Sequence, residues 1–202
     1  MKLHFSAASP FVRKVLVCAH EVGLADRIEI VPTKVVPSEP NRDYGRVTPL
    51  MKVPALERDD GSTLFDSVVI CEYLDSLSRG VKLFPPAGDA RWRALRMHAL
   101  ADGILDAAVL TRYETFLRPA ELRWRAWIDG QLLKVDQALD FLEANAPDLD
   151  AMTIGSVGAG CALGYLDFRF GDRQWRNGRP GIAAWFETMS KRPSFQNTVP
   201  KG

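Results

Sequence analysis

The first 31 residues read as a strand, a helix and a second strand, and this order restricts the fold more than any other feature of the sequence. Lys2 to Phe5 and Arg27 to Val31 are predicted to form short strands. The residues between them include apolar positions at the four-three-four spacing of one helical face: Phe11, Val15, Cys18 and Val22. Strands joined by a helix favour parallel pairing through a right-handed crossover.

The sequence up to residue 78 extends this sheet and then ends it with a helix. A loop rich in proline and charge leads to "VPAL" and then, across Asp59-Asp60-Gly61, to "LF". Two short apolar runs around an Asp-Gly turn predict a β-hairpin. From Ser67, "SVVICEYLDSL" has helical periodicity. Residues 1–78 are therefore predicted to form an α/β domain.

The second half has no convincing strand pattern. Residues 79–89 carry glycine and two prolines, so we expect a linker there. Residues 90–202 are predicted to form an all-α helical bundle, with Gly103 bending or interrupting its first long helix. In "TIGSVGAGCALGYLDFRF", Thr153 and Ser156 occupy the positions of a capping box. The expected helical segments are "ARWRALRMHALADGILDAAVLTRYETFL", "AELRWRAWIDGQLLKVDQALDFLEANAP", "TIGSVGAGCALGYLDFRF" and "GIAAWFETMSKR".

Composition narrows the functional class. Hydrophobic residues make up 47% and charged residues 25% of the 202 residues, and the formal net charge is +1. These values are those of an ordinary globular protein and carry no polybasic signal for nucleic acid or an anionic membrane. Neither a signal peptide nor a transmembrane segment is evident, so we expect a cytoplasmic protein. The three cysteines lack the spacing of a disulfide framework or a metal site, and no metal is expected.

Three short motifs carry the chemical information. Ser9 precedes Pro10, which suits the first turn of a helix, so Ser9 is predicted to be the N-cap. Val53-Pro54 stands between a loop and a strand, and a cis peptide there would free the Val53 backbone for pairing with a bound peptide. In "FDS", Asp66 or Ser67 caps a helix whose first amides attract a carboxylate. Each motif alone also has a purely structural explanation.

Together, Ser9-Pro10-Phe11, "KVPAL" and "FDS", followed by an all-helical half, resemble the glutathione S-transferase family. The chain is similar to the serine-type cytosolic branch and, through "GYLDFRF" and "RPSF", to small bacterial members. The resemblance implies a thioredoxin-like N-terminal domain that binds glutathione as co-substrate. It also implies an apolar acceptor site between the domains and a homodimer.

The resemblance also assigns roles to individual residues. Ser9 would contact the glutathione sulfur and is the expected catalytic residue, with Ser6 as the alternative. Val53 would pair through its backbone with the cysteinyl part, next to a cis Pro54. The glutathione-binding set implied by the family is Lys52, Val53, Pro54, Asp66, Ser67 and Asp102. Asp66 and Ser67 would hold the γ-glutamyl end, and Lys52 would reach the glycine carboxylate.

Phe11 and Tyr113 are the expected residues of the acceptor pocket, and Asp102 is a candidate contact to the partner subunit's glutathione. Cys18 lies on the apolar face of its helix, where a free cysteine behaves as a small hydrophobe. The sequence thus predicts a glutathione transferase of the detoxification type that activates the thiol for attack on small, mostly apolar electrophiles, or for peroxide reduction. The alternative is a member of the same fold that binds glutathione or a protein without catalysis.

Overall fold

The computed structural model describes all of residues 1–202 and divides the chain into two compact units. Unit 1 contains Met1–Phe84 and Pro193–Gly202, and unit 2 contains Pro85–Arg192. Unit 1 combines a four-stranded sheet with helices, whereas unit 2 is entirely helical. This confirms the expected fold class, a thioredoxin-like α/β domain followed by an all-α helical domain.

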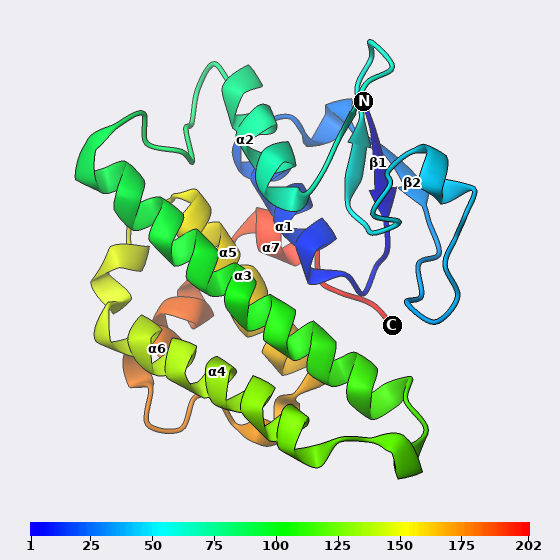
Figure 1. The fold of residues 1–202 in the computed structure, drawn as a ribbon. Coiled ribbons are helices and arrows are strands. Elements are labelled where there is room, and N and C mark those ends of the chain that lie inside the picture. The colour runs from blue at the N-terminus through cyan, green and yellow to red at the C-terminus, as the bar shows by residue number, and fades with distance from the viewer. The chain divides into compact units, whose positions relative to one another are not determined.

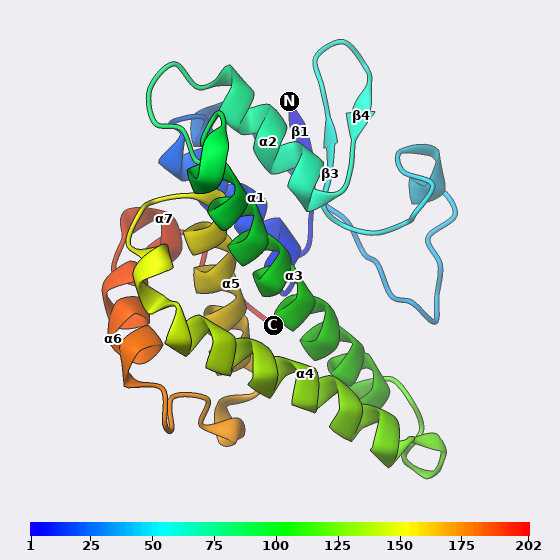
Figure 2. The same ribbon diagram turned by 60° about the vertical axis from the view of Figure 1, so that its left-hand side comes forward.

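Unit 1 contains the helices and strands that were predicted for residues 1–78 (Figure 1). The strand order β2-β1-β3-β4 is mixed, because β1 pairs in parallel with β2 and antiparallel with β3. Helices α1 and α2 pack against each other on one side of the sheet (Figure 2). The elements are β1 Lys2–Phe5, α1 Pro10–Glu21, η1 Ala25–Arg27, β2 Glu29–Pro32, η2 Tyr44–Arg46, β3 Ala55–Glu57, β4 Thr63–Leu64, α2 Ser67–Leu77 and α7 Pro193–Gln196.

The buried side of α1 carries the apolar positions that predicted the helix. Val15 and Cys18 are fully buried, as is Cys71 on α2. A hydrogen bond with Cys71 and burial together raise the pKa of the Cys18 thiol well above its usual range. Since only the thiolate is a good nucleophile, Cys18 is a packing residue. This agrees with the sequence-based interpretation.

The C-terminal segment departs from the expected domain boundaries. Residues 193–202 were assigned to the helical domain, yet they group with unit 1. The Arg13 guanidinium on α1 donates to the carbonyl of Phe195 (3.3 Å), and the Lys201 amide donates to the carbonyl of Ala7 (3.2 Å). These contacts join residues far apart in the chain, so local sequence patterns carry no sign of them. The short helix α7 was not predicted.

Unit 2 is built around the long helix α3, which packs against both α4 and α5 (Figure 2). Helix α3 runs through Gly103 without interruption, so the predicted break there is wrong. It also begins at Gly88, inside the expected linker 79–89. The elements are α3 Gly88–Phe116, η3 Ala120–Leu122, α4 Arg125–Ala144, η4 Ala146–Leu149, α5 Ile154–Arg169, η5 Gly171–Arg173 and α6 Pro180–Met189. None of these helices combines the length and apolar character that a membrane span requires.

Candidate functional site

Strand register brings the three predicted motifs of unit 1 to the same edge of the sheet. In the β1–β3 pair His4 lies opposite Ala55, so Pro54 falls level with the carboxyl end of β1. In the β3–β4 pair Leu56 lies opposite Leu64, so Pro54, just before β3, and Asp66, shortly after β4, lie beyond the same edge of the sheet. The link from β1 to α1, which ends at Ser9, also leaves from this edge.

Ser9 is the N-cap of α1, as predicted. Its backbone is extended, Pro10 occupies the first helical turn, and its hydroxyl oxygen accepts a hydrogen bond from the Val12 amide (3.3 Å). That bond uses a lone pair of the oxygen. The Ser9 hydroxyl donates no hydrogen bond within the chain, so its proton is available to a ligand. At the positive end of a helix dipole, such a proton is suited to an anionic sulfur.

The peptide bond between Val53 and Pro54 is cis, the geometry that the family resemblance implies. Val53 lies just before β3 and is half-buried. Its amide and carbonyl take part in no backbone hydrogen bond outside the helices and strands. An unpaired donor and acceptor at the end of a strand can pair with the main chain of an extended peptide.

Asp66 caps α2, and its Oδ1 atom accepts a hydrogen bond from the Val68 amide (3.0 Å). The residue is exposed, whereas the neighbouring Ser67 is only 2% exposed. The preceding peptide bond, between Phe65 and Asp66, is also cis. A carboxylate beside the free amides of a helix start offers both signs of charge to a ligand that carries an amine and a carboxylate.

Two further predicted residues lie in unit 1. Lys52 is exposed, so its ammonium group is available to a carboxylate in solvent. Phe11, in the first turn of α1, is half-buried, and the Lys14 ammonium lies 5.6 Å from the centre of its ring.

Asp102 and Tyr113, the other two predicted residues, lie on α3 in unit 2. The Asp102 carboxylate is 3.4 Å from Nε2 of His98, one helical turn away. Partial burial raises the pKa of Tyr113, so this residue presents a protonated phenol. Their roles, toward a second subunit and an acceptor, stay predictions.

Sequence reasoning missed Tyr44, which contacts the site from the loop between β2 and β3. Its hydroxyl donates to the carbonyl of Lys52 (3.0 Å), directly before Val53. Its ring lies 4.9 Å, between ring centres, from His4. No spacing rule links these residues. The one available signal was a single aromatic residue in a loop rich in proline and charge.

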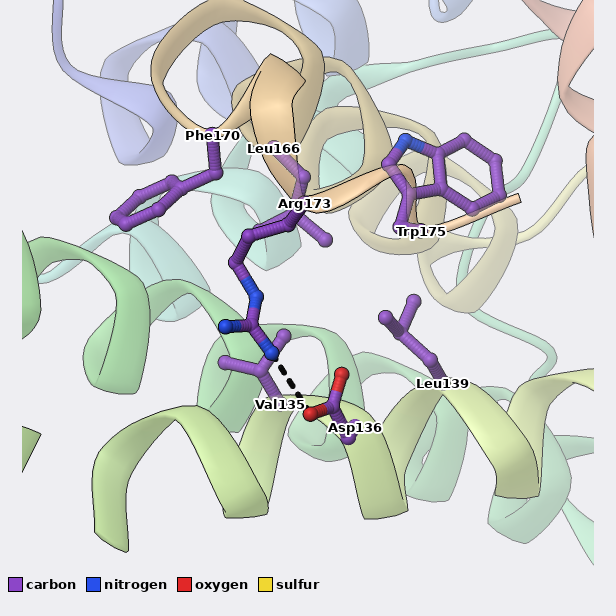
Figure 3. Close-up of a pocket in the computed structure, with 7 residues that line it drawn as sticks. All are labelled: Val135, Asp136, Leu139, Leu166, Phe170, Arg173 and Trp175. Atoms are coloured by element: carbon purple, nitrogen blue, oxygen red, sulfur yellow. Dashed lines mark hydrogen bonds and ion pairs between the residues drawn. The ribbon is translucent and has the colours of Figure 1, made fainter. Parts of the chain in front are cut away.

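Unit 2 contains a small crevice where the end of α5 and η5 face α4 (Figure 3). It is lined by Val135, Asp136, Leu139, Leu166, Phe170, Arg173 and Trp175. The Arg173 guanidinium reaches across it to Oδ2 of Asp136 (2.7 Å), so the two charges satisfy each other (Figure 3). The remaining lining is mostly apolar, and the crevice offers no unpaired polar group for catalysis.

The polar groups at the sheet edge in unit 1 match the parts of a small anionic peptide. They comprise a hydroxyl proton at a helix start, an unpaired stretch of backbone and a second helix start with a carboxylate. No cluster of His, Cys, Asp or Glu side chains is placed to hold a metal ion. The hydroxyl and backbone groups at this edge can recognise a ligand and stabilise an anion through hydrogen bonds.

Comparison with known proteins identifies this architecture. Residues 8–77 match the model of the glutathione S-transferase N-terminal domain, and residues 125–188 match that of the C-terminal domain. The uncharacterized GST-like protein YibF of Escherichia coli (strain K12) is 32% identical over 204 residues, which cover 99% of this chain and 98% of that protein.

Solved structures are similar over the whole chain. A glutathione transferase family member from Pseudomonas fluorescens Pf-5, crystallised with bound glutathione, is 45% identical with a TM-score of 0.97, covering 100% of this chain and 99% of that one. A glutathione S-transferase from Methylobacillus flagellatus KT, with glutathione bound, is 36% identical with a TM-score of 0.86, covering 99% of each chain. The chain belongs to the glutathione S-transferase family.

Proposed function

We propose that this protein is a serine-type glutathione S-transferase that joins glutathione, through its sulfur, to small, mostly apolar electrophiles. Glutathione is its co-substrate, and Ser9 is the residue that activates the thiol. A second reaction of this site is the reduction of organic peroxides, in which two glutathione molecules are oxidised to the disulfide and the peroxide becomes an alcohol and water. We further propose that the protein acts as a cytoplasmic homodimer in detoxification.

The observation that carries the proposal is the hydroxyl of Ser9, whose oxygen caps α1 while its proton stays available. A thiol with a pKa near 8.5 is only a few per cent ionised at pH 7, and the thiolate is the nucleophile. A hydrogen bond from Ser9, together with the positive end of α1, stabilises the anion. Lowering the thiol pKa by about two units corresponds to roughly 2.7 kcal/mol and makes the thiolate the main species at neutral pH.

The remaining unit 1 residues hold the tripeptide while the sulfur reacts. Val53 pairs with the cysteinyl main chain through its unpaired amide and carbonyl. Asp66 and the start of α2 take the γ-glutamyl amine and carboxylate, and Lys52 takes the glycine carboxylate. Similar proteins crystallised with glutathione support this assignment of ligand. The thiol releases its proton to solvent, and the thiolate then attacks the electrophilic carbon and displaces its leaving group as an anion. Ser9 remains a hydrogen-bond donor throughout.

The test combines retention on immobilised glutathione with turnover of an activated aryl halide. In Ser9→Ala we expect glutathione affinity to change little and turnover at neutral pH to fall by about tenfold or more, since most of the bound thiol becomes protonated. The pH at which activity reaches half of its maximum should rise toward the pKa of the free glutathione thiol. Ser6→Ala is the matched control, because Ser6 lies in the same link and also carries a hydroxyl.

Loss of turnover in Ser6→Ala with none in Ser9→Ala would move the catalytic role to Ser6. Retention without turnover in the wild type would favour a glutathione-binding protein that does not catalyse. Neither retention nor turnover would favour a protein-interaction member of the fold and overturn the proposal.

A further inference from the structure

We propose that Tyr44 is a positioning residue for the glutathione site, because its hydroxyl holds the backbone on which Val53 pairs with the tripeptide. The inference rests on the proposed function and names a residue that neither the motifs nor the family resemblance assigned. The link is direct, since the Tyr44 hydroxyl donates to the carbonyl of Lys52 at 3.0 Å and Lys52 is the residue before Val53.

The Tyr44 end of this hydrogen bond is firmly fixed. Tyr44 is only 5% exposed and begins the 3₁₀ turn η2. Its amide donates to Oδ1 of Asn41 (3.0 Å), and its carbonyl accepts from the amides of Val47 (2.9 Å) and Thr48 (3.1 Å). A side chain held through both its ring and its backbone can fix the position of a group that it contacts.

The Lys52 end, by contrast, has little else to hold it. Pro49, Leu50 and Lys52 are exposed, and Met51 adopts a left-handed backbone conformation (φ 49°). Residues other than glycine populate that region rarely, so this conformation persists only where surrounding contacts hold it. Two such contacts flank Met51. Its own amide donates to the carbonyl of Thr48 (3.1 Å), and the Tyr44 hydroxyl holds the next carbonyl.

A polar network anchors the Tyr44 ring to the sheet. The ring packs at a tilt of 41° against His4 on β1. Nε2 of His4 lies 2.8 Å from Oε1 of Glu57 on β3, and Nδ1 lies 2.9 Å from the hydroxyl of Thr33, just after β2. An ionised carboxylate only accepts hydrogen bonds, so Nε2 is the donor to Glu57. Two strands and the residue that follows a third therefore support one loop residue.

The Tyr44 hydroxyl remains a donor throughout the working pH range. Burial and the nearby Glu57 carboxylate raise the pKa of Tyr44 well above its usual range. The phenol keeps its proton, and that proton points to the Lys52 carbonyl. Deprotonation of Tyr44 therefore does not break this hydrogen bond near neutral pH.

The test is Tyr44→Phe, which removes the hydroxyl and keeps the ring. We expect the dissociation constant for glutathione to rise about three- to tenfold, the typical effect of losing one neutral hydrogen bond. Turnover at saturating glutathione and the pH midpoint of activity should stay at wild-type values, because Ser9 is untouched. In the absence of glutathione, amide hydrogen exchange across Leu50, Met51, Lys52 and Val53 should become faster.

The matched control is Tyr73→Phe, which removes a phenol from α2 in the same unit, where the ring contacts Arg58 and lies outside the Lys52 segment. It should leave glutathione affinity and exchange in this segment unchanged. Unchanged exchange in Tyr44→Phe, with or without weaker glutathione binding, would overturn the positioning role. If the wild type failed to bind glutathione, the proposed function would fail. The exchange comparison made without ligand would still decide whether Tyr44 holds this backbone.

Discussion

Gly155, at the start of α5, gives the sharpest test of how unit 2 is packed. A Cβ built at this position would lie 2.7 Å from Cβ of Met97 and 2.8 Å from the carbonyl oxygen of Ala94, both on α3. Neither atom can turn away by a side-chain rotation, because one is backbone and the other is attached directly to it. Gly155→Ala therefore forces α3 and α5 apart.

The size of the effect follows from two opposing terms. Carbon atoms in contact prefer a separation of about 3.5–4.0 Å, so the helices must separate locally by close to an ångström. Overpacking of this kind costs about 1–3 kcal/mol, and the rigid obstacles place Gly155→Ala near the upper end. Alanine regains at most about 1 kcal/mol of helix propensity. We expect a net loss of about 2 kcal/mol in the free energy of unfolding.

The assay is chemical denaturation followed by circular dichroism, with glycine variants elsewhere in the helices as controls. Gly103 and Gly130 have no atom within 4 Å of the added Cβ, so alanine there should stabilise by about 0.5–1 kcal/mol. For Gly158→Ala, the added Cβ would lie 3.1 Å from Cβ of Ala101. We expect its change in the free energy of unfolding to lie between those of Gly155→Ala and Gly103→Ala. A Gly155→Ala protein as stable as Gly103→Ala would refute the inference that α3 and α5 touch through this glycine.

Two further predictions concern helix ends in unit 2. Ser156 accepts from the Thr153 amide and donates to the Thr153 carbonyl, both at 2.8 Å, so Ser156→Ala should lower the free energy of unfolding by about 1–2 kcal/mol in denaturation experiments. The exposed Ser76→Ala should have almost no effect, and equal losses would contradict the capping role. Hydrogen bonds from the Trp124 amide and the Arg118 guanidinium lower the pKa of Glu114 in the folded protein. The Glu114 carboxylate is therefore protonated more readily in the unfolded chain than in the folded one. The stability that this carboxylate contributes is lost as pH falls below about 4.5. Glu114→Gln should therefore show a weaker acid dependence of unfolding than the wild type, whereas the exposed Glu121→Gln should follow the wild-type curve.

The elements that sequence predicted well are those specified by neighbouring residues. The strand β1, the helices α1 and α2 and the N-caps at Ser9 and Thr153 all follow from periodicity and capping within a few positions. β2 illustrates the limit at element ends. It was expected from Arg27, but Arg27 closes a 3₁₀ turn through a hydrogen bond to the carbonyl of Leu24, and the strand begins at Glu29.

Elements that depend on distant contacts could not be predicted. The break expected at Gly103 does not occur, since α3 packs on both α4 and α5 and this packing outweighs the helix penalty of one glycine, about 1 kcal/mol. Tyr44 and His4 became visible as supports of the candidate site only once the sheet had brought Glu57 and Thr33 beside them. These two partners lie 53 and 29 residues from His4 in the chain.

The hydrogen bonds of Ser9 show that capping α1 is compatible with the proposed role of this side chain in the site. At Ser156 the oxygen accepts one hydrogen bond, the proton is donated in another, and the side chain is 1% exposed, so nothing remains for a ligand. At Ser9 the hydroxyl oxygen only accepts a hydrogen bond, from the Val12 amide, at the long distance of 3.3 Å. The hydroxyl donates no hydrogen bond within the chain. Asp66 follows the same pattern, because Oδ1 caps α2 while Oδ2 has no hydrogen-bond partner. Capping and ligand binding are therefore compatible roles for one side chain, and counting donors and acceptors separates the two serines where the capping motif alone does not.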